Sequence, residues 1–524
     1  MIRRVLAVAT AVVLPLAAMD ATAEFPAVAD SVSEGLKELL LERDDAGRAR
    51  VDDATMAYLE GLPRQGIEGL EDAVSEEWIT SSDHLLQILS LRLDASKLEL
   101  ALRDNCFLCH SDPESHGEDT LLRSGAGDDE TRGHMRLDHY AADVHFRRGL
   151  GCGGCHGGDS AEMMDHDFPS EWPESSAERR EDRTWIPQFC ARCHSDAAYM
   201  RGFNPELATD QLEKYRTSRH GQLLLEHKDS RVAQCVSCHG VHGIQGSRSP
   251  LSMVSPKRVP ETCASCHSDG ALMAGFELED GSPMPTDQFA SYKSSVHGRA
   301  LLERGDLGAP ACNDCHGNHA AMPPEVASVA QICRTCHLRN GTLFDGSRHK
   351  AAFEKNNWPE CETCHGNHAI ARTDDAMLAP GTGSMCESCH DEHARENPEC
   401  NATAAYFHAE LTGLSASYEH YAEETEHVAR RGLDTEALQV ELTNLFDSLK
   451  LARSYIHAFE RSEFAQAVAP GHAGIAAVDE LLRAGEEEMR FRISGLVIAC
   501  AFIAATILLL YLKLRSMESG QPPS

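Results

Sequence analysis

The chain has 524 residues, enough for several domains, yet only 6% of them are aromatic. Its formal net charge at pH 7 is −34, which argues against nucleic-acid binding because a phosphate backbone attracts basic surfaces. Such an acidic surface either keeps the protein solvated or attracts a basic partner protein.

Residues 1–23 have the features of a secretory signal peptide. Arg3 and Arg4 supply positive charge, Val5 to Ala18 form the apolar run, and Ala21-Thr22-Ala23 offers a cleavage site of small residues. An uncleaved membrane anchor is the alternative, but the apolar run is short for a bilayer. The sequence therefore predicts export of the mature chain.

We expect the next segment, residues 24–104, to be helical. Ser33 to Arg48 and the leucine-rich stretch from His84 to Leu102 fit helices, whereas Gly61 to Glu77 is predicted to be an irregular connection. His84 is a candidate ligand, although a histidine in this setting is more often a core or surface residue.

The pattern C-x-x-C-H occurs nine times between residues 105 and 400. It is the attachment signal for a c-type haem. Two thiols three positions apart on a helical turn face one side and can bond the two vinyl groups of a porphyrin. The next residue then places an imidazole under the iron. Zinc or a disulfide would use C-x-x-C alone, without a histidine in every copy.

We therefore predict nine c-type haems, each named below by the first cysteine of its site. The thioether cysteines are Cys106, Cys109, Cys152, Cys155, Cys190, Cys193, Cys235, Cys238, Cys263, Cys266, Cys312, Cys315, Cys333, Cys336, Cys361, Cys364, Cys386 and Cys389. The proximal ligands are His110, His156, His194, His239, His267, His316, His337, His365 and His390. Only Cys400 and Cys500 remain, and neither is assigned a function.

The sites alternate between a plain form and an elaborated form that continues as Gly-x-His. Elaborated sites start at Cys235, Cys312 and Cys361, and their plain partners at Cys190, Cys263 and Cys333. Cys106 and Cys152 begin a looser first pair, and the Cys386 site stands alone at the end. This duplication predicts four stacked haem pairs and one terminal haem.

Two classes of histidine can supply the second axial ligands. A histidine three residues beyond a proximal one cannot reach the far face of its own haem, but it can reach a neighbouring iron. The other class lies upstream of elaborated sites, at predicted helix starts. His457, which borders a helix face near the C-terminus, is a further candidate, with His472 as runner-up. The candidates are His145, His220, His242, His297, His319, His349, His368, His393 and His457.

Residues 401–492 are predicted to form an antiparallel helical stalk. One packed helix face is indicated by a 4-3-4-3-4-3 spacing of Leu438, Leu442, Leu445, Leu449, Ala452, Ile456 and Phe459. The preceding stretch, Thr403 to Arg431, is also expected to be helical and to end at Gly432.

A transmembrane helix is predicted at 493–513, followed by a cytoplasmic tail at 514–524. The run from Ile493 to Leu512 contains no charged residue and is long enough to cross a bilayer. Basic residues flank both ends, so the orientation follows from export of the haem region rather than from charge. This places the haems on the periplasmic side of the bacterial inner membrane. A buried helix of a soluble domain is the alternative.

The predicted fold is therefore mainly α with much irregular loop. It is a multihaem cytochrome c fold organised around stacked haems in residues 105–400, with a C-terminal helical hairpin and one transmembrane helix. Nine apolar porphyrins can serve as the core that the side chains alone would not supply.

The paired motifs, the Cys-His-Gly-x-His form and the helical tail resemble the periplasmic multihaem cytochromes c. That class includes NapC/NirT-type quinol dehydrogenases, carriers with doubled CxxCH motifs, pentahaem nitrite reductase and hydroxylamine oxidoreductase. The resemblance covers about residues 105–470 and implies that His242, His319 and His368 ligate neighbouring haems. It also implies that the long helix after the last haem contributes a histidine and a homodimer contact. The chain lacks a C-x-x-C-K site, and its predicted anchor is not N-terminal as in NapC/NirT proteins.

Electron transfer is the function that this ligand supply favours, because an iron with two histidines has no open position. We expect a non-catalytic carrier that takes electrons from membrane quinol or a membrane complex. It would pass them to redox proteins or other acceptors in the periplasm or outside the cell. No catalytic residue is assigned.

Two other functions fit the same sequence. A reductase or oxidoreductase of a small nitrogen or sulfur compound would need one open haem, and the first pair, with His110 and His156, is the least provided. The nearby histidines that could fill the vacancy or act as acid–base groups are His116, His134, His139 and His166. The protein could instead be a subunit of a larger respiratory complex.

Overall fold

A computed structural model describes residues 32–44, 48–111, 137–159, 169–170, 172–173, 176–278, 281–321, 330–380, 385–390 and 398–520. The predicted signal peptide and four histidines lie outside these ranges: His116, His134, His166 and His393. The described part is helical and has no β-strand, only two isolated bridges, which confirms the predicted mainly helical class. The chain divides into two units, Met1–Arg258 and Val259–Ser524.

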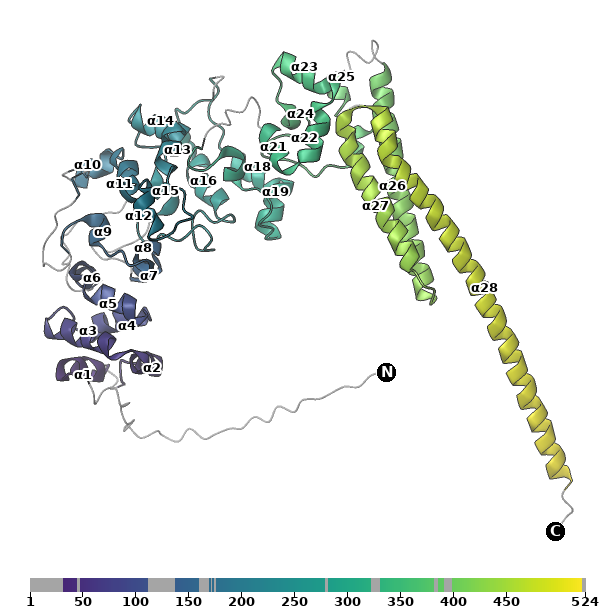
Figure 1. Cartoon of the computed structure of the whole chain (residues 1–524), viewed down its shortest axis with the longest axis horizontal. Helices are drawn as coiled ribbons and strands as arrows, with labels where there is room; N and C mark the ends of the chain where they lie inside the picture. Colours follow the sequence, from purple (N-terminus) through teal and green to yellow (C-terminus); the bar gives the residue numbers. More distant parts are fainter. Residues whose placement is uncertain are drawn as a thin grey trace. The chain divides into compact units, whose positions relative to one another are not determined.

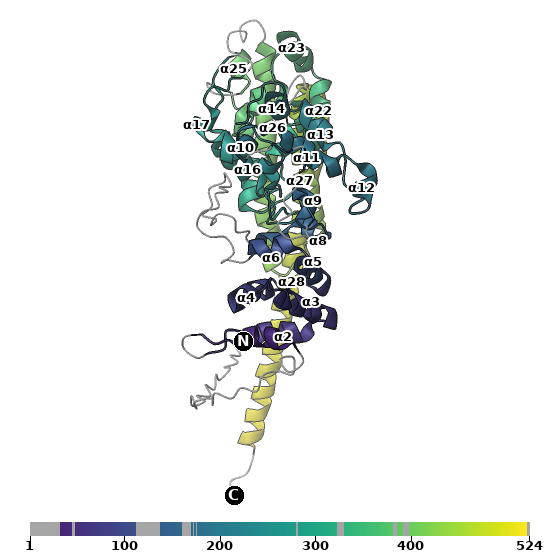
Figure 2. The ribbon, with the colours of Figure 1, turned by 90° about the vertical axis from the view of Figure 1, so that its left-hand side faces the viewer.

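The first unit opens with a helical module that carries no C-x-x-C-H site and is purple in Figures 1 and 2. These helices are α1 (Glu34–Leu41), α2 (Asp53–Gly61), α3 (Arg64–Ser75), α4 (Ser82–Ser90) and α5 (Ala95–Leu102). The prediction of an irregular connection at 61–77 is wrong, because α3 occupies it and buries Leu70 and Ala73. The helix predicted from His84 to Leu102 is two helices, separated at Arg92, which has a φ of 49°.

The core of this module reaches the first haem segment. Leu36, Leu70, Leu85 and Leu98 are fully buried in one cluster, which continues to Phe107 in the Cys106 site. His84 is also fully buried, with its Nε2 2.8 Å from the Oγ of Ser111. The structure therefore shows His84 as a hydrogen-bonded core residue.

The C-x-x-C-H segments lie on short helices, which gives the two thiols their common face. The remaining helices of the first unit are α6 (Asn105–Ser111), α7 (Leu137–Ala142), α8 (Val144–Arg147), α9 (Gly153–His156), α10 (Ser176–Glu181), α11 (Trp185–His194), α12 (Ala197–Arg201), α13 (Gln211–Thr217), α14 (Arg219–Leu225) and α15 (Cys235–His239). Four sites, those of Cys106, Cys152, Cys190 and Cys235, are in this unit.

The second unit carries the other five sites and then the stalk. Its haem region contains α16 (Val259–His267), α17 (Gly270–Met273), α18 (Gln288–Ser294), α19 (Val296–Gly298), η1 (Arg299–Glu303), α20 (Cys312–His316), α21 (Ala330–Cys336), α22 (Leu338–Asp345), α23 (Arg348–Asn356), α24 (Glu360–His365), η2 (Asp375–Leu378) and α25 (Glu387–His390). Longer loops such as 304–311 and 366–374 alternate with connections of one to three residues, such as the one between α21 and α22.

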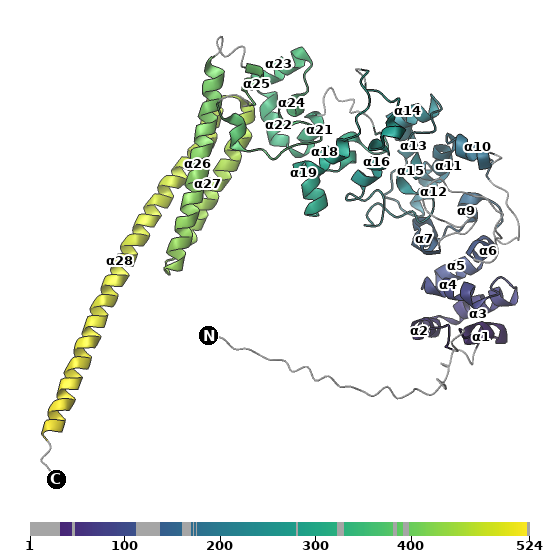
Figure 3. The ribbon, with the colours of Figure 1, turned by 180° about the vertical axis from the view of Figure 1, so that it is seen from behind.

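The stalk is a helical bundle (Figures 1 and 3). The hairpin predicted within residues 401–492 packs against a third long helix, which continues toward the C-terminus. Its elements are α26 (Pro398–Arg430), α27 (Glu436–Tyr455), η3 (Ile456–Ala458) and α28 (Arg461–Ser519). Phe407, Leu445, Leu449 and Phe464 form its core near the haem region. Gly432, with a φ of 82°, follows the end of α26, where a helix stop was predicted.

The second half of α28 extends beyond the bundle (Figure 1). Its side chains are exposed from Phe491 onward, and it holds the one stretch of the described chain long and apolar enough to cross a membrane. Arg492 donates to the carbonyl oxygen of Gly432 at 3.4 Å, so the turn after α26 lies beside the start of that stretch.

Candidate haem-binding sites

Six proximal histidines each face one of the predicted distal histidines. In every pair the two imidazole ring centres lie about 6 Å apart. The pairs are His145–His194 (6.0 Å), His156–His242 (5.9 Å), His297–His337 (6.2 Å), His316–His368 (5.9 Å), His349–His390 (6.0 Å) and His365–His457 (6.1 Å).

This separation fits an iron held between two imidazoles. An imidazole nitrogen lies about 2 Å from a bound transition metal and about 1 Å from its own ring centre, so two opposite ligands have ring centres roughly 6 Å apart. Two histidines that met only through packing or a hydrogen bond would have no reason to repeat this distance six times. The residues therefore fit bis-histidine haems at these sites.

The other described candidates are three proximal histidines, His110, His239 and His267, and two distal candidates, His220 and His319. Each of them takes part in contacts of its own, and their pairing stays a prediction. His393 lies outside the described residues. His472, the runner-up to His457, is on the stalk surface with its Nε2 2.8 Å from a carboxylate oxygen of Glu410.

A glycine after the proximal histidine reverses the chain at each elaborated site. Gly240, Gly317 and Gly366 have φ values of 82°, 77° and 73°, a region that residues with a Cβ rarely adopt. The turn carries the Gly-x-His histidine away from its own site. Accordingly, His242 faces the Cys152 site and His368 faces the Cys312 site.

The helices that carry His220 and His297 are capped in the same way. Ser218 and Ser295 each accept a hydrogen bond from a glycine N–H three residues later, at 2.9 Å. A Cβ on Gly298 would lie only 2.0 Å from the carbonyl oxygen of Tyr292. Only glycine therefore permits this tight approach.

Tyrosines that the sequence analysis did not single out hold these helices in place. The hydroxyl of Tyr215 donates to the carbonyl of Ala233 at 2.9 Å, and that of Tyr292 to the carbonyl of Pro310 at 2.8 Å. Each acceptor lies two residues before the first cysteine of an elaborated site. The repeated spacing Tyr-x-x-Ser-x-His-Gly was visible in the sequence and could have identified them.

In each unit, one backbone hydrogen bond joins the segment of an upstream candidate histidine to the segment of a Gly-x-His candidate histidine. The N–H of Val144 donates to the carbonyl of Ile244 at 2.7 Å, and in the second unit the N–H of Val296 donates to that of Ile370 at 2.9 Å. The donor precedes an upstream histidine, and the acceptor lies two residues beyond a Gly-x-His histidine. The bond therefore fixes the candidate ligands of two neighbouring sites relative to each other.

Cysteines of successive sites lie against one another. Thiols are hydrogen-bonded in the pairs Cys190–Cys235, Cys263–Cys312 and Cys333–Cys361. Others interact electrostatically: Cys106–Cys152, Cys155–Cys193, Cys315–Cys333 and Cys364–Cys389. Each sulfur would form a thioether with its haem, so contacts between sulfurs would bring the attachment edges of successive haems together. The contacts link four successive sites in the first unit and five in the second.

Burial favours the neutral form of several of the paired imidazoles. Desolvation, followed by the repulsion of His242, lowers the pKa of His156 to about 4. Desolvation also lowers the pKa of His349, His365 and His457. A neutral imidazole has a lone pair to give to a metal, whereas a protonated one does not. The environment therefore favours the ligating form at neutral pH.

Charged side chains bridge neighbouring sites. The buried carboxylate of Asp104, just before the Cys106 site, accepts from the N–H of Cys152 at 2.9 Å. In the second unit Arg334, within the Cys333 site, pairs with the buried Glu360, which directly precedes Cys361. These contacts fix the spacing between neighbouring C-x-x-C-H helices.

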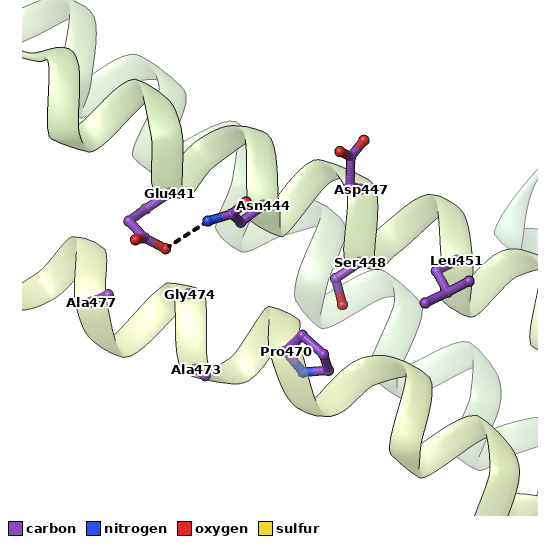
Figure 4. A pocket seen from close by; sticks show the side chains of 9 residues that line it. All are labelled: Glu441, Asn444, Asp447, Ser448, Leu451, Pro470, Ala473, Gly474 and Ala477. Carbon is purple, nitrogen blue, oxygen red and sulfur yellow. Dashed lines mark hydrogen bonds between the residues drawn. The ribbon is translucent and has the colours of Figure 1, made fainter.

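Three further features concern the two remaining cysteines and a groove on the stalk. The Sγ of Cys400 lies 3.7 Å from the Nε2 of His390, and Cys500 is exposed on α28. A shallow groove of about 530 Å³ lies between α27 and α28 (Figure 4), and none of its lining residues is a predicted ligand. The described chain has no group of three or more His, Cys, Asp or Glu side chains arranged to hold a bare metal ion.

Comparison with known proteins identifies one matching family model. It describes a doubled CXXCH motif and matches residues 227–272, which include the Cys235 and Cys263 sites. No curated protein and no solved structure was found to match the chain. The match indicates a multihaem c-type cytochrome domain, and such a domain implies electron transfer.

Proposed function

We propose that this protein is a membrane-anchored nonahaem cytochrome c of the periplasm that conducts electrons along its chain of haems. The observation that carries the proposal is the set of six histidine pairs at the separation of bis-histidine haem ligands. When bound, each haem supplies one ferric/ferrous couple. The histidines on both faces leave no position for a substrate, so these sites exchange electrons only.

The contacts between successive sites support conduction. Electron transfer weakens steeply with distance, and the cysteine contacts bring the edges of neighbouring haems together at each step within a unit. A reductase, the second candidate, would need an open iron. Because His242 faces His156, the Cys106 site is the member of the first pair on which that candidate now rests.

The length of the stalk determines how far some haem sites lie from the membrane, and therefore which partners they can reach. His457, which faces the Cys361 site, directly precedes α28. From Arg461 to Arg492 this helix rises roughly 45 Å at 1.5 Å per residue. The Cys361 and Cys386 sites are therefore held far from the bilayer. We propose that they exchange electrons with a redox protein, whereas quinol or a membrane complex would have to use other haems.

Removal of one distal ligand tests the proposal. His368→Ala should convert one haem, at the Cys312 site, from low-spin to high-spin in the electron paramagnetic resonance (EPR) spectrum. His472→Ala is the matched control and should change nothing, because His472 pairs with Glu410 instead. Fewer than nine haems by mass, or a His368→Ala spectrum without a high-spin signal, would contradict the proposal.

A further inference from the structure

The position two residues before each upstream distal histidine differs in one copy. Ser218, Ser295 and Ser347 occupy it in three copies, whereas the first copy has Asp143. All four residues are buried. The exchange places a carboxylate within reach of one haem ligand.

Asp143 holds the imidazole of His145. Its Oδ1 accepts from the N–H of His145 at 2.8 Å and lies 3.1 Å from the ring Nδ1. Its Oδ2 accepts from the N–H of Ile244 at 2.9 Å. The carboxylate is thereby held beside the imidazole ring by two backbone N–H groups. The Nε2 of His145 is left for the iron at the Cys190 site.

Two other distal histidines have weaker acceptors or none at Nδ1. The Nδ1 of His457 donates to the carbonyl of Ser454 at 2.9 Å. The Nδ1 of His349 is buried without a hydrogen-bond partner among the described residues, and its ring lies against Phe459 with centres 3.8 Å apart. The hydroxyl of Ser347 is directed to the carbonyl of Phe344 instead, at 2.7 Å.

We propose that Asp143 is a redox-tuning residue that gives the Cys190 haem a lower reduction potential than the Cys386 haem. A carboxylate bound to Nδ1–H gives the imidazole partial imidazolate character and makes it a stronger donor. A stronger donor stabilises ferric over ferrous iron. In the titration each iron takes one electron from a mediator, and no bond is made or broken. The inference rests on the proposed haem ligation by His145 and His349.

Ring orientation makes these two haems observable among the others. The two imidazole planes cross at 84° both at the Cys190 site and at the Cys386 site. In the other four pairs the planes cross at 14–36°. Perpendicular imidazoles give a low-spin ferric EPR signal with an unusually large maximum g value, and near-parallel ones give a rhombic signal. Each of these two haems should therefore contribute a large-g signal, distinct from the rhombic signals of the four near-parallel pairs.

The test is an EPR-monitored redox titration of the full haem-loaded protein. In the wild type the large-g signals should include a lower and a higher midpoint. Asp143→Asn keeps the oxygen that accepts from His145 but removes the charge and the acceptor of the Ile244 N–H, and it should raise the lower midpoint alone. Ser347→Asp, at the matching position, should lower the higher midpoint alone. Midpoints unchanged in both variants, with both signals retained, would overturn the proposal.

His145→Ala separates the tuning from the ligation. This variant should remove the large-g signal with the lower midpoint and produce one high-spin haem. If it does so but Asp143→Asn and Ser347→Asp leave the midpoints unmoved, the ligation stands and the tuning is wrong. If both large-g signals survive in His145→Ala, the assignment of His145 as a ligand fails and this inference fails with it.

Discussion

At the scale of single residues, glycine decides where the chain can bring a histidine back to a haem. Gly298 illustrates the requirement, because a Cβ there would lie 2.0 Å from the carbonyl oxygen of Tyr292, far inside contact distance. The helix that carries His297 would have to move. That helix also donates to the loop of His368 through Val296, so the disturbance would reach two sites.

Gly298→Ala should therefore destabilise the second unit by about 1–3 kcal/mol, the usual cost of overpacking. Gly270→Ala is the control, because a Cβ on Gly270 meets no atom within 4 Å, and it should stay within about 0.5 kcal/mol of wild type. Guanidinium unfolding followed by circular dichroism compares the two. Equal midpoints for both variants would refute the steric argument.

The residue types of the candidate sites were predictable, but their partners were not. The spacing of His242 and His368 marked them as ligands of other haems, and the structure brings each to a proximal histidine. Which haem each one meets depends on how the chain turns back: His242 faces His156, although His194 is nearer in sequence. The role proposed for Asp143 was equally unpredictable, because it depends on the contact between its carboxylate and the imidazole ring of His145.

At the scale of elements, charged side chains fix one C-x-x-C-H helix against the next. Glu360 at the start of α24 is buried and pairs with Arg334 in α21 and Lys350 in α23. Three helices thus converge on one carboxylate. Removal of its charge would leave two cations without their shared partner in a partly buried setting.

Glu360→Gln should cost about 1.5–3 kcal/mol of stability, the range for hydrogen bonds to charged groups. Glu354→Gln removes a different, exposed partner of Lys350 and should cost no more than about 0.5 kcal/mol. Thermal and guanidinium unfolding measure both. A Glu354→Gln variant as unstable as Glu360→Gln would show that burial of Glu360 adds nothing.

Sequence patterns could not predict some of the helices, and the reason is physical. Gly66 and Gly69 lie within the stretch that was predicted to be an irregular connection, and the structure places both in α3. A Cβ on Gly69 would lie 3.3 Å from the Cδ1 of Leu102, so the glycine permits close approach of α3 and α5. Glycine in a helix marks either a break or a tight contact, and the choice needs the partner helix, which only the tertiary structure supplies.

At the scale of the whole molecule, α28 performs two tasks in succession. Phe464, Ala467, Val468 and Val478 of its first half are buried in the stalk. Its second half, from Ile493, is exposed and apolar. The stalk core and the candidate ligand His457 therefore do not depend on the apolar half.

A chain that stops after Arg492 should consequently be released from the membrane with every haem in place. Its EPR spectrum and redox midpoints should match those of the full-length protein, because no residue after Arg492 packs against a described haem site.

A chain that stops after Glu460 is the matched control. It loses the α28 side of the stalk core, so it should unfold more easily and lose the low-spin signal of the Cys361 site, whose ligand His457 adjoins the deleted helix. Fractionation, mass analysis for haem and EPR report the three properties separately. If the first truncation stayed in the membrane, the anchor would lie elsewhere, and if it lost a haem, the division of α28 into stalk and anchor would be wrong.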